Sequence, residues 1–556
     1  MATSHLPDAM RARIAYDGTR TPVKTGLFVI VCLAWILPGL VGHDPWKGDE
    51  AIAFGIVADM LRTGDWVHLQ IGGLGYPGKT PLYFWVAASL GQLLHPWVPL
   101  HDAARLASGV FMAATLAGVS LTAFELMGER AMRIGVLLFI GCLGLLLKAH
   151  EMNSDLAGLT GIAWGLYGLA LVPRRARVAG VICGLALGVA FLGDGFLPLA
   201  LLAVTMAAVP FAAPAYRTRS YAQAVAIALL CAAPLLALYP VLLAGNRWSN
   251  LAMWLAQATQ SRWSGEDGAR LGLLNVVYFV KILPWYAWPA WPLAAWSLWK
   301  ARNTLSTRRD LQMPFVAFLA FLVVLSFFAE AREINALPLL IPLSLLGVAE
   351  IDSVKRGAAS ALDWFGLTTF FLMALLIWVA WVAALTGTPE IAALWIQREL
   401  PGFKYPFQFV PFAFAALLTL IWLVVVARSL RTTRRALVNW AAGITMVWML
   451  VMTLGVPGID QARSYRGVGQ QIAERLPVGY RCAIGVGVGD TQRALLHRYA
   501  GMFIERPDGP SAYACKVRIV QASPDNIPAA EPGWTELWRG ARPADKTEIL
   551  LLYKRG

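Results

Sequence analysis

Two acidic residues and a lysine near the start of the chain have the types and the order that a group-transfer site needs. Asp49 and Glu50 lie in the stretch HDPWKGDEAIAFGIVADMLRTGDW, and Lys79 follows in YPGKTPLYFW. A lysine neutralises a phosphate, while a carboxylate beside it accepts a proton from an attacking hydroxyl or orients an acceptor. These residues therefore predict transfer chemistry. The alternative is that the Asp-Glu pair only stabilises a helix N-terminus.

The elements that must position these residues belong to a membrane protein. The chain has 556 residues, of which 58% are hydrophobic and only 14% are charged, and it contains 23 tryptophans. No ordinary soluble domain has this balance. We expect thirteen apolar runs to span the membrane, at 25–42, 103–126, 131–148, 155–172, 178–192, 196–213, 222–245, 273–299, 313–329, 335–350, 362–386, 408–428 and 436–456.

Lysines and arginines mark every second loop as cytoplasmic, so the net charge of +14 reflects membrane orientation and nucleic acid is not an expected partner. The N-terminal segment 1–24 also lies inside in this scheme. The alternation then requires that the apolar run 81–97 does not cross, and its aromatic flanks predict a helix in the interface. The alternative is that 81–97 is a short true span. The alternation of loops would then be wrong at another run, and the short run 178–192 is the obvious candidate.

The outer face then carries three polar regions, which are the loop 43–102, the loop 246–272 and the tail 457–556. Short β-like and helix-like runs in the tail predict a small soluble α/β domain. Cys482 and Cys515 each open such a run. They could form a disulfide in an oxidising compartment, whereas in a cytoplasmic tail they would stay reduced.

The order of these pieces resembles the polyprenyl-phosphate-sugar-dependent glycosyltransferases of the GT-C class, which include the bacterial aminoarabinose (lipid A) transferases and the protein O-mannosyltransferases. The matching positions are Asp49-Glu50, Met60-Leu61, Gly64-Asp65-Trp66, Tyr76, Lys79-Thr80-Pro81-Leu82 and Phe84-Trp85. The resemblance implies a helical bundle in the bacterial inner membrane, interfacial helices in its outer loops, and a periplasmic domain after the last span.

The resemblance also implies roles for individual residues. Asp49 would be catalytic, with Glu50 and Asp155 as further catalytic candidates, and Lys79 and Arg262 would bind the phosphate of the carrier. The run REINALPLL adds Arg332 and Asn335 as additional candidates. Two alternatives stay open, because Asp155 could cap the end of a span and Arg262 could simply face lipid phosphates.

The chain also departs from the pattern of these transferases. Ile52 and Ala53 stand where many relatives have Arg and Tyr, Gly78 replaces a frequent Glu, Asp194 replaces the Lys of a Lys-Gly pair, and Asn335 replaces a late Tyr. These departures argue against assuming the familiar substrate. No cofactor is predicted, and the sequence leaves a divalent metal open without showing a ligand cluster for one.

The expected function is the transfer of a hexose or pentose from an undecaprenyl-phosphate carrier to a periplasmic acceptor, which would be lipid A or lipopolysaccharide, another glycan, or a protein. A transporter or flippase of lipid-linked sugars is the alternative from another class. It predicts ionisable residues within the spans and inverted repeats. A catalytically inactive relative with a binding or assembly role is a further alternative.

Overall fold

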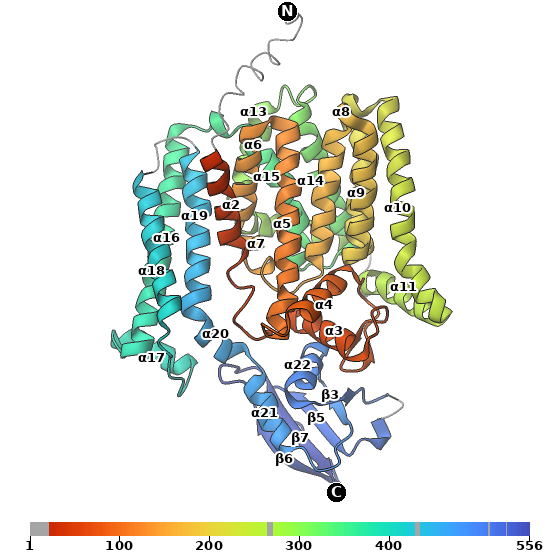
Figure 1. The fold of residues 1–556 in the computed structure, drawn as a ribbon, viewed down its shortest axis with the longest axis vertical. Helices are drawn as coiled ribbons and strands as arrows, with labels where there is room; N and C mark the ends of the chain where they lie inside the picture. Colours follow the sequence, from red (N-terminus) through yellow and green to blue (C-terminus); the bar gives the residue numbers. More distant parts are fainter. Residues whose placement is uncertain (1–21, 264–270, 429–433, 510–511, 530) are drawn as a thin grey trace, which may run out of the picture.

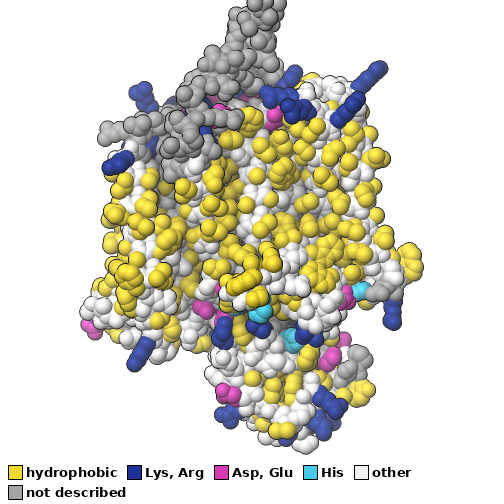
Figure 2. Space-filling model, in the orientation of Figure 1, with side chains coloured by type: hydrophobic (Ala, Val, Ile, Leu, Met, Phe, Trp, Pro, Cys, Tyr) yellow, Lys and Arg dark blue, Asp and Glu magenta, His cyan; other side chains and the backbone are white. Residues whose placement is uncertain are grey.

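The protein consists of a large helical bundle with a small α/β domain at one end (Figure 1). This computed structural model describes residues 22–263, 271–428, 434–509, 512–529 and 531–556. Most of the predicted cytoplasmic segment 1–24 lies outside the described residues. Apolar side chains cover the flank of the bundle, and charged side chains gather at its two ends (Figure 2).

Seven segments of the described chain are long and apolar enough to cross a membrane. They are α5 (Leu100–Met127), α8 (Asp155–Asp194), α10 (Arg219–Asn246), α14 (Arg309–Phe328), α16 (Arg356–Thr386), α18 (Phe409–Arg428) and a run that begins with α19 (Arg435–Leu450). The bundle also contains α2 (Pro22–Ile36), α6 (Glu129–Ile140), α7 (Leu143–Lys148), α9 (Phe196–Ala212), α12 (Leu271–Tyr286), α13 (Ala290–Ala301) and α15 (Leu337–Ala349). The predicted polytopic helical fold is confirmed, while the count of thirteen spans stays a prediction.

Helix α8 consists of two arms that pack against each other. The backbone leaves the helical conformation at Arg175 (φ −142°, ψ 65°), and the sequence predicts separate spans on either side of this break. A Cβ atom on Gly161 would lie 2.5 Å from the backbone nitrogen of Ala190, so only glycine permits this close approach of the arms. As a result, Asp155 and Asp194 lie at the same end of the bundle although they are the first and last residues of α8.

Two of the predicted spans are each divided into two helices. The run 131–148 contains α6 and α7, which are separated at Gly141 and Cys142, and the run 273–299 contains most of α12 and α13. Pro289 stands immediately before α13. Because proline has no backbone N–H, it cannot continue the hydrogen-bond ladder of α12. The apolar pattern identifies such a run but not an interruption within it.

Shorter elements cover the end of the bundle that faces the small domain (Figure 1). They are α3 (Asp49–Thr63), β1 (Gln70–Ile71), β2 (Leu74–Gly75), α4 (Leu82–Leu94), α11 (Trp248–Trp263) and α17 (Glu390–Glu399). Helix α4 is the predicted interfacial helix. It has 13 residues, and its place in the interface stays a prediction.

The chain leaves the bundle through α20 (Val456–Arg463) and forms the α/β domain predicted for the tail. The elements are α21 (Arg466–Arg475), β3 (Ala483–Val486), α22 (Asp490–Ala500), β4 (Ile504–Glu505), β5 (Val517–Ala522), β6 (Trp534–Gly540) and β7 (Ile549–Arg555). The sheet order is β4-β3-β5-β7-β6, with β3 parallel to both β4 and β5 and the remaining pairs antiparallel.

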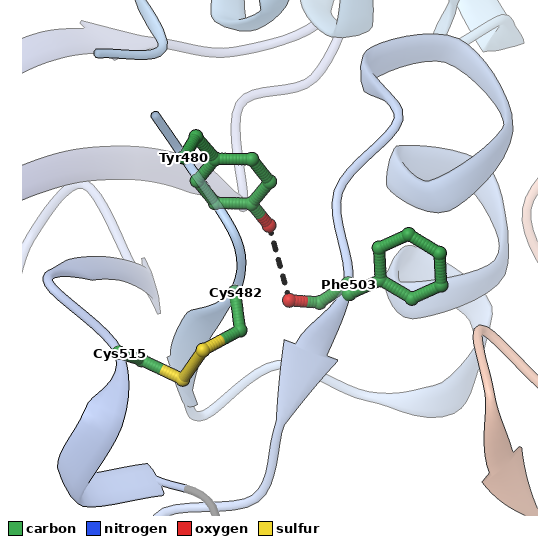
Figure 3. The surroundings of a disulfide bond; sticks show 4 residues. All are labelled: Tyr480, Cys482, Phe503 and Cys515. Atoms are coloured by element: carbon green, nitrogen blue, oxygen red, sulfur yellow. Dashed lines mark hydrogen bonds between the residues drawn. A yellow bond between two sulfur atoms is a disulfide. The ribbon is translucent and has the colours of Figure 1, made fainter. Parts of the chain in front are cut away.

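The structure contains the disulfide between Cys482 and Cys515, which ties the start of β3 to the segment before β5 (Figure 3). Nearby, the Tyr480 hydroxyl donates a hydrogen bond of 3.1 Å to the carbonyl oxygen of Phe503. The disulfide lies beside two interior strands, and the hydrogen bond reaches the residue before the edge strand β4. The segment after β4 contributes to the site described below.

The small domain packs directly on the loop 43–102 through α22 and α3. Ala51 of α3 belongs to the buried apolar core of the small domain, and a Cβ atom on Gly55 would lie only 2.7 Å from Cβ of Ala494. An ion pair between Asp44 and Arg466 adds a polar contact between the two parts. The tail domain therefore covers the loop that carries Asp49.

Candidate functional site

Asp49 begins α3 at the end of the bundle that lies under the tail domain. Gly48 before it has φ 123°, a backbone conformation that favours glycine. The two carboxylate oxygens of Asp49 lie 3.4 and 3.5 Å from Nη2 of Arg332, and the side chain is 33% exposed. The described contacts of this carboxylate are thus to a cation from another segment, and its partial exposure leaves it accessible to a ligand.

Glu50 points away from Asp49 into the protein. Its side chain is buried, with Oε1 accepting a hydrogen bond of 2.6 Å from Nε of Arg105 and Oε2 accepting one of 3.1 Å from the Trp46 backbone. Arg105 also pairs with Asp102 at 2.8 Å. Burial opposes ionisation of Glu50, but the positive charge of Arg105 outweighs it, and the pKa of Glu50 is lowered overall. This geometry favours a positioning role over the predicted catalytic one.

Lys79 lies between two carboxylates. Its Nζ donates a hydrogen bond of 3.0 Å to Oδ1 of Asp194 and lies 3.7 Å from Oδ2 of Asp155. Burial alone would lower the pKa of Lys79, but the negative charges of Asp155 and Asp194 raise it above its ordinary value. The lysine is therefore a permanent cation at neutral pH.

The two arms of α8 supply both of these carboxylates. Asp155 is the first residue of the helix, and its backbone N–H donates a hydrogen bond of 3.0 Å to Oδ1 of Asn153. The Asn153 side chain thus satisfies this backbone donor, and the Asp155 carboxylate is directed to Lys79. Asp194 ends the second arm, so the helical hairpin brings it to the same lysine.

One cavity of about 510 Å³ brings most of the predicted site residues together. Asp49, Lys79, Asp155, Arg332 and Asn335 all line it. Three cations and five carboxylates contribute to its wall, namely Lys79, Arg332 and Arg506, and Asp49, Asp155, Asp194, Glu330 and Asp490. The charged groups of the described lining therefore carry a formal excess of two negative charges.

A second cavity of about 450 Å³ adjoins the first and is mainly apolar. The two cavities share Tyr76, Trp254, Gln257 and Arg506 in their walls. The second one extends between α10, α11 and the segment after β4, with Leu243 among its apolar residues. Together they offer a charged compartment beside an apolar one, which suits a ligand with a polar head and a hydrocarbon part.

The remaining predicted residues differ in how far the structure describes them. Asn335 lines the cavity, and its side-chain amide donates a hydrogen bond of 2.9 Å to the Glu330 carbonyl, which fixes the segment before α15. Arg262 lies on α11, but its side chain is outside the described residues. Its expected contact with the carrier phosphate stays a prediction.

Among the described residues, no group of three or more histidine, cysteine and acidic side chains could hold a metal ion. The carboxylates of Asp155 and Asp194 are instead arranged around the ammonium group of Lys79. The chemistry that these residues offer is that of cations, proton acceptors and hydrogen-bond acceptors.

Sequence reasoning missed several members of this cavity. Asp194 is visible in the sequence only as a departure from the transferase pattern, and its pairing with Lys79 depends on the packing of the two α8 arms. Asp490 and Arg506 come from the tail domain. No local motif marks them, because their place in the cavity depends on the docking of that domain.

The fold and the cavity define a class, a polytopic membrane protein with a polar cavity between its helical bundle and a small soluble domain. The chain shares this fold with ArnT from Cupriavidus metallidurans. The structure of ArnT bound to undecaprenyl phosphate has a TM-score of 0.68 at 18% identity, covering 96% of this chain and 98% of that one. The apo structure of ArnT gives 0.64 over the same shares. The predicted fold class and the resemblance to the aminoarabinose transferases are confirmed.

In sequence, the chain is 30% identical over 187 residues to the undecaprenyl phosphate-alpha-4-amino-4-deoxy-L-arabinose arabinosyl transferase of Pseudomonas savastanoi pv. phaseolicola. This match covers 32% of the chain and 34% of that enzyme, so the chain spans about a third of the length of the curated relative that it matches. No model of a protein family matches the chain.

Proposed function

We propose that the protein is a membrane glycosyltransferase that takes a sugar from an undecaprenyl-phosphate carrier and passes it to an acceptor in the periplasm. The observation that carries this proposal is the convergence of Asp49, Lys79, Asp155 and Arg332 on one cavity from separate segments of the chain. The fold shared with ArnT and the sequence similarity to an arabinosyl transferase support it.

The proposed reaction is a single displacement at the anomeric carbon of the sugar. The acceptor hydroxyl attacks this carbon while Asp49 accepts the hydroxyl proton. The bond between the anomeric carbon and the phosphate oxygen breaks, and its electron pair stays on that oxygen. Undecaprenyl phosphate leaves with one more negative charge, and a single displacement of this kind inverts the anomeric configuration.

Lys79 is the proposed partner of this developing charge. A cation placed where negative charge forms in the transition state lowers the barrier, and more so in a site shielded from water. Since the carboxylates of Asp155 and Asp194 already hold the lysine, an incoming phosphate has to share it with them. Arg332 contacts Asp49 and lines the same cavity, so it is placed to orient the proton acceptor or to bind a second anionic group.

In the proposed orientation, the cavity and the tail domain 457–556 face the periplasm and the membrane is the bacterial inner membrane. The arginine-rich loops at the other end of the bundle support this orientation through the positive-inside rule. The disulfide between Cys482 and Cys515 agrees with it, because disulfides persist in oxidising compartments such as the periplasm. Lipid A or lipopolysaccharide, another glycan and a protein are the candidate acceptors.

Mass spectrometry of envelope glycolipids and proteins from cells with and without the protein tests the proposal and identifies sugar and acceptor together. The wild type adds a sugar mass that Asp49→Asn and Lys79→Ala do not. Loss of a general base lowers the rate by about 10² to 10⁴. Asp525→Asn and Lys404→Ala are matched controls, because both residues are exposed and neither lines the cavity.

Binding of undecaprenyl phosphate to the purified full-length protein separates the two roles. Lys79→Ala weakens binding roughly tenfold or more, because a hydrogen bond to a charged group contributes about 1.5–3 kcal/mol. Asp49→Asn binds the carrier as the wild type does but does not support transfer. Near wild-type transfer by both variants would contradict the assignment of this cavity as the active site.

A further inference from the structure

A cavity with a cluster of arginines in its wall lies far from the proposed active site. It has a volume of about 800 Å³ and opens at the end of the bundle opposite the tail domain. Five arginines contribute to its wall, namely Arg130, Arg174, Arg308, Arg309 and Arg434. They come from the ends of several helices, so the fold, and not one basic stretch of sequence, brings them together. Figure 2 shows lysine and arginine side chains gathered at this end.

The acidic residues of this cavity offset only part of its charge. Glu125, Asp310 and Asp352 line the same wall, and Arg308 also pairs with Glu350, which lies outside the lining. The five arginines therefore exceed the carboxylates around them. Among the described residues, Arg309 takes part in no ion pair. The cavity thus presents an excess of guanidinium groups to whatever enters it.

Apolar residues also contribute to the wall of this cavity. Leu126, Ile134 and Val348 line it together with the arginines, and Ile134 packs against the main apolar core. A cavity with both guanidinium groups and apolar side chains in its wall suits a molecule with an anionic head and a hydrocarbon part.

We infer that this cavity is a second binding site, separate from the proposed active site, which takes a phosphate group, and that an anionic phospholipid head group is its source. Arginine suits this ligand because its planar fork donates two parallel hydrogen bonds to phosphate oxygens. Basic pockets between the cytoplasmic ends of membrane helices are a known way of holding anionic lipids. Free inorganic phosphate has the same chemistry and is the other source to be tested.

The positive-inside rule alone accounts for arginines at this end but not for their arrangement around a cavity. Arg302 provides the matched comparison, since it is exposed at the same end and does not line the cavity. If only the overall charge of this end of the bundle determines lipid binding, removing the charge of Arg302 weakens the binding as much as removing that of Arg309.

The test uses delipidated full-length protein in detergent, titrated with phosphatidylglycerol, with phosphatidylcholine or with inorganic phosphate. Bound lipid is counted by native mass spectrometry, and the midpoint of thermal unfolding is recorded. Wild-type protein binds phosphatidylglycerol more tightly than phosphatidylcholine. Arg309→Gln weakens this binding about fivefold, and Arg174→Gln adds a similar factor, as expected for the loss of one charge each. Arg309→Lys keeps part of the affinity, and Arg302→Gln leaves it unchanged.

The outcomes separate the two sources and the generic effect of charge. Equal losses in Arg302→Gln and Arg309→Gln, or no loss in either, overturn the site. Protection by inorganic phosphate that depends on Arg309, with no preference for phosphatidylglycerol, overturns the lipid as the source and supports a free phosphate site. Because these measurements do not involve sugar transfer, their failure leaves the proposed function untouched.

Discussion

Two clusters of charge lie side by side at the end of the bundle next to the tail domain, and they differ in how they face the solvent. In the cavity, Asp49 and Arg332 remain partly exposed, and their closest approach is 3.4 Å. Behind it, Glu50 and Arg105 are buried and pair at 2.6 Å. The open cluster of Asp49 and Arg332 leaves its charged groups accessible to a ligand. In the closed cluster of Glu50 and Arg105, the charged groups are buried and pair with each other.

The helix explains why neighbours in the sequence belong to different clusters. Successive residues of an α-helix point about 100° apart because the helix has 3.6 residues per turn. At the start of α3, Asp49 is turned toward the cavity and Glu50 toward α5. The comparison teaches that the Asp-Glu pair is not one structural unit, since Asp49 faces the cavity and Glu50 holds the loop that carries it.

The largest expected effect concerns the stability of the closed cluster. Glu50→Ala leaves Arg105 buried without its closest partner, and breaking a buried pair costs about 3–5 kcal/mol. Asp49→Ala removes a partly exposed pair, for which the loss is about 1 kcal/mol or less. Thermal unfolding of the two purified variants in the same detergent measures this difference.

The same pair of positions also separates positioning from catalysis. Glu50→Gln retains an acceptor for the Trp46 N–H, so the protein that still folds is expected to keep its turnover number and to lose stability. Asp49→Asn is expected to lose turnover and to keep its stability. Equal turnover losses per folded molecule in the two variants would mean that Glu50 acts in catalysis as the sequence predicts.

The sequence predicts the open cluster better than the closed one, and the reason is physical. Asp49 and Lys79 are recognisable because they recur in an ordered motif, and Asp155 because it begins an apolar span. Arg105, in contrast, has only Asp102, three residues earlier in α5, as a partner that the local sequence could indicate. Its role depends on Glu50, which is distant in the chain and is brought close only by the packing of α3 on α5.

The fold was predictable to a similar degree. Apolar runs indicate where the helical bundle lies in the chain and the tail pattern indicates a soluble α/β domain, because both depend on local pattern. The division of 273–299 into α12 and α13 and the docking of the tail do not follow from local pattern. The sequence therefore does not predict that Arg506 lines the cavity. Its position depends on the docking of the tail domain through contacts such as that between Gly55 and Ala494.

A smaller effect is expected from Asp194, which makes the open cluster more negative. Asp194→Asn leaves a neutral side chain beside Lys79 and removes the negative charge that an incoming phosphate would meet. A unit charge nearby at the effective dielectric constant of such sites changes the energy by about 1 kcal/mol or more, so undecaprenyl phosphate binds roughly fivefold or more tightly. Titration of the purified variant with this lipid measures the change.

Asp490→Asn is the matched control for that change. Asp490 lines the same cavity but pairs with Arg493 of its own helix and makes no described contact with Lys79. Its removal is expected to change carrier affinity less than that of Asp194. If Asp194→Asn binds undecaprenyl phosphate more weakly than the wild type, the carboxylate is needed to position the lysine and does not compete with the phosphate.

The smallest effect concerns a third cluster, which joins the loop 43–102 to the tail domain. Asp44 is buried, accepts a hydrogen bond from the Ser464 hydroxyl at 2.6 Å and pairs with the half-exposed Arg466. Burial raises the pKa of Asp44, but the hydrogen bonds from Arg466 and Ser464 outweigh it and lower the pKa below its ordinary value. Such a group stabilises the folded protein above its unfolded pKa of about 3.9 and loses this contribution as the pH falls toward the lower folded value.

Wild type and Asp44→Asn are therefore expected to differ in unfolding midpoint at pH 6, by an amount that reflects about 1 kcal/mol because Arg466 is half exposed. The difference shrinks when the comparison is repeated near pH 3, since the carboxylate of the unfolded wild type is then mostly protonated and ionisation in the folded state stabilises it less. The closed cluster around Glu50 has no exposed partner and gives the contrast, because its variants stay less stable than the wild type over the same range. A gap between wild type and Asp44→Asn that is constant from pH 6 to pH 3 would show that the contact is held by its shape and hydrogen bonds and not by its charge.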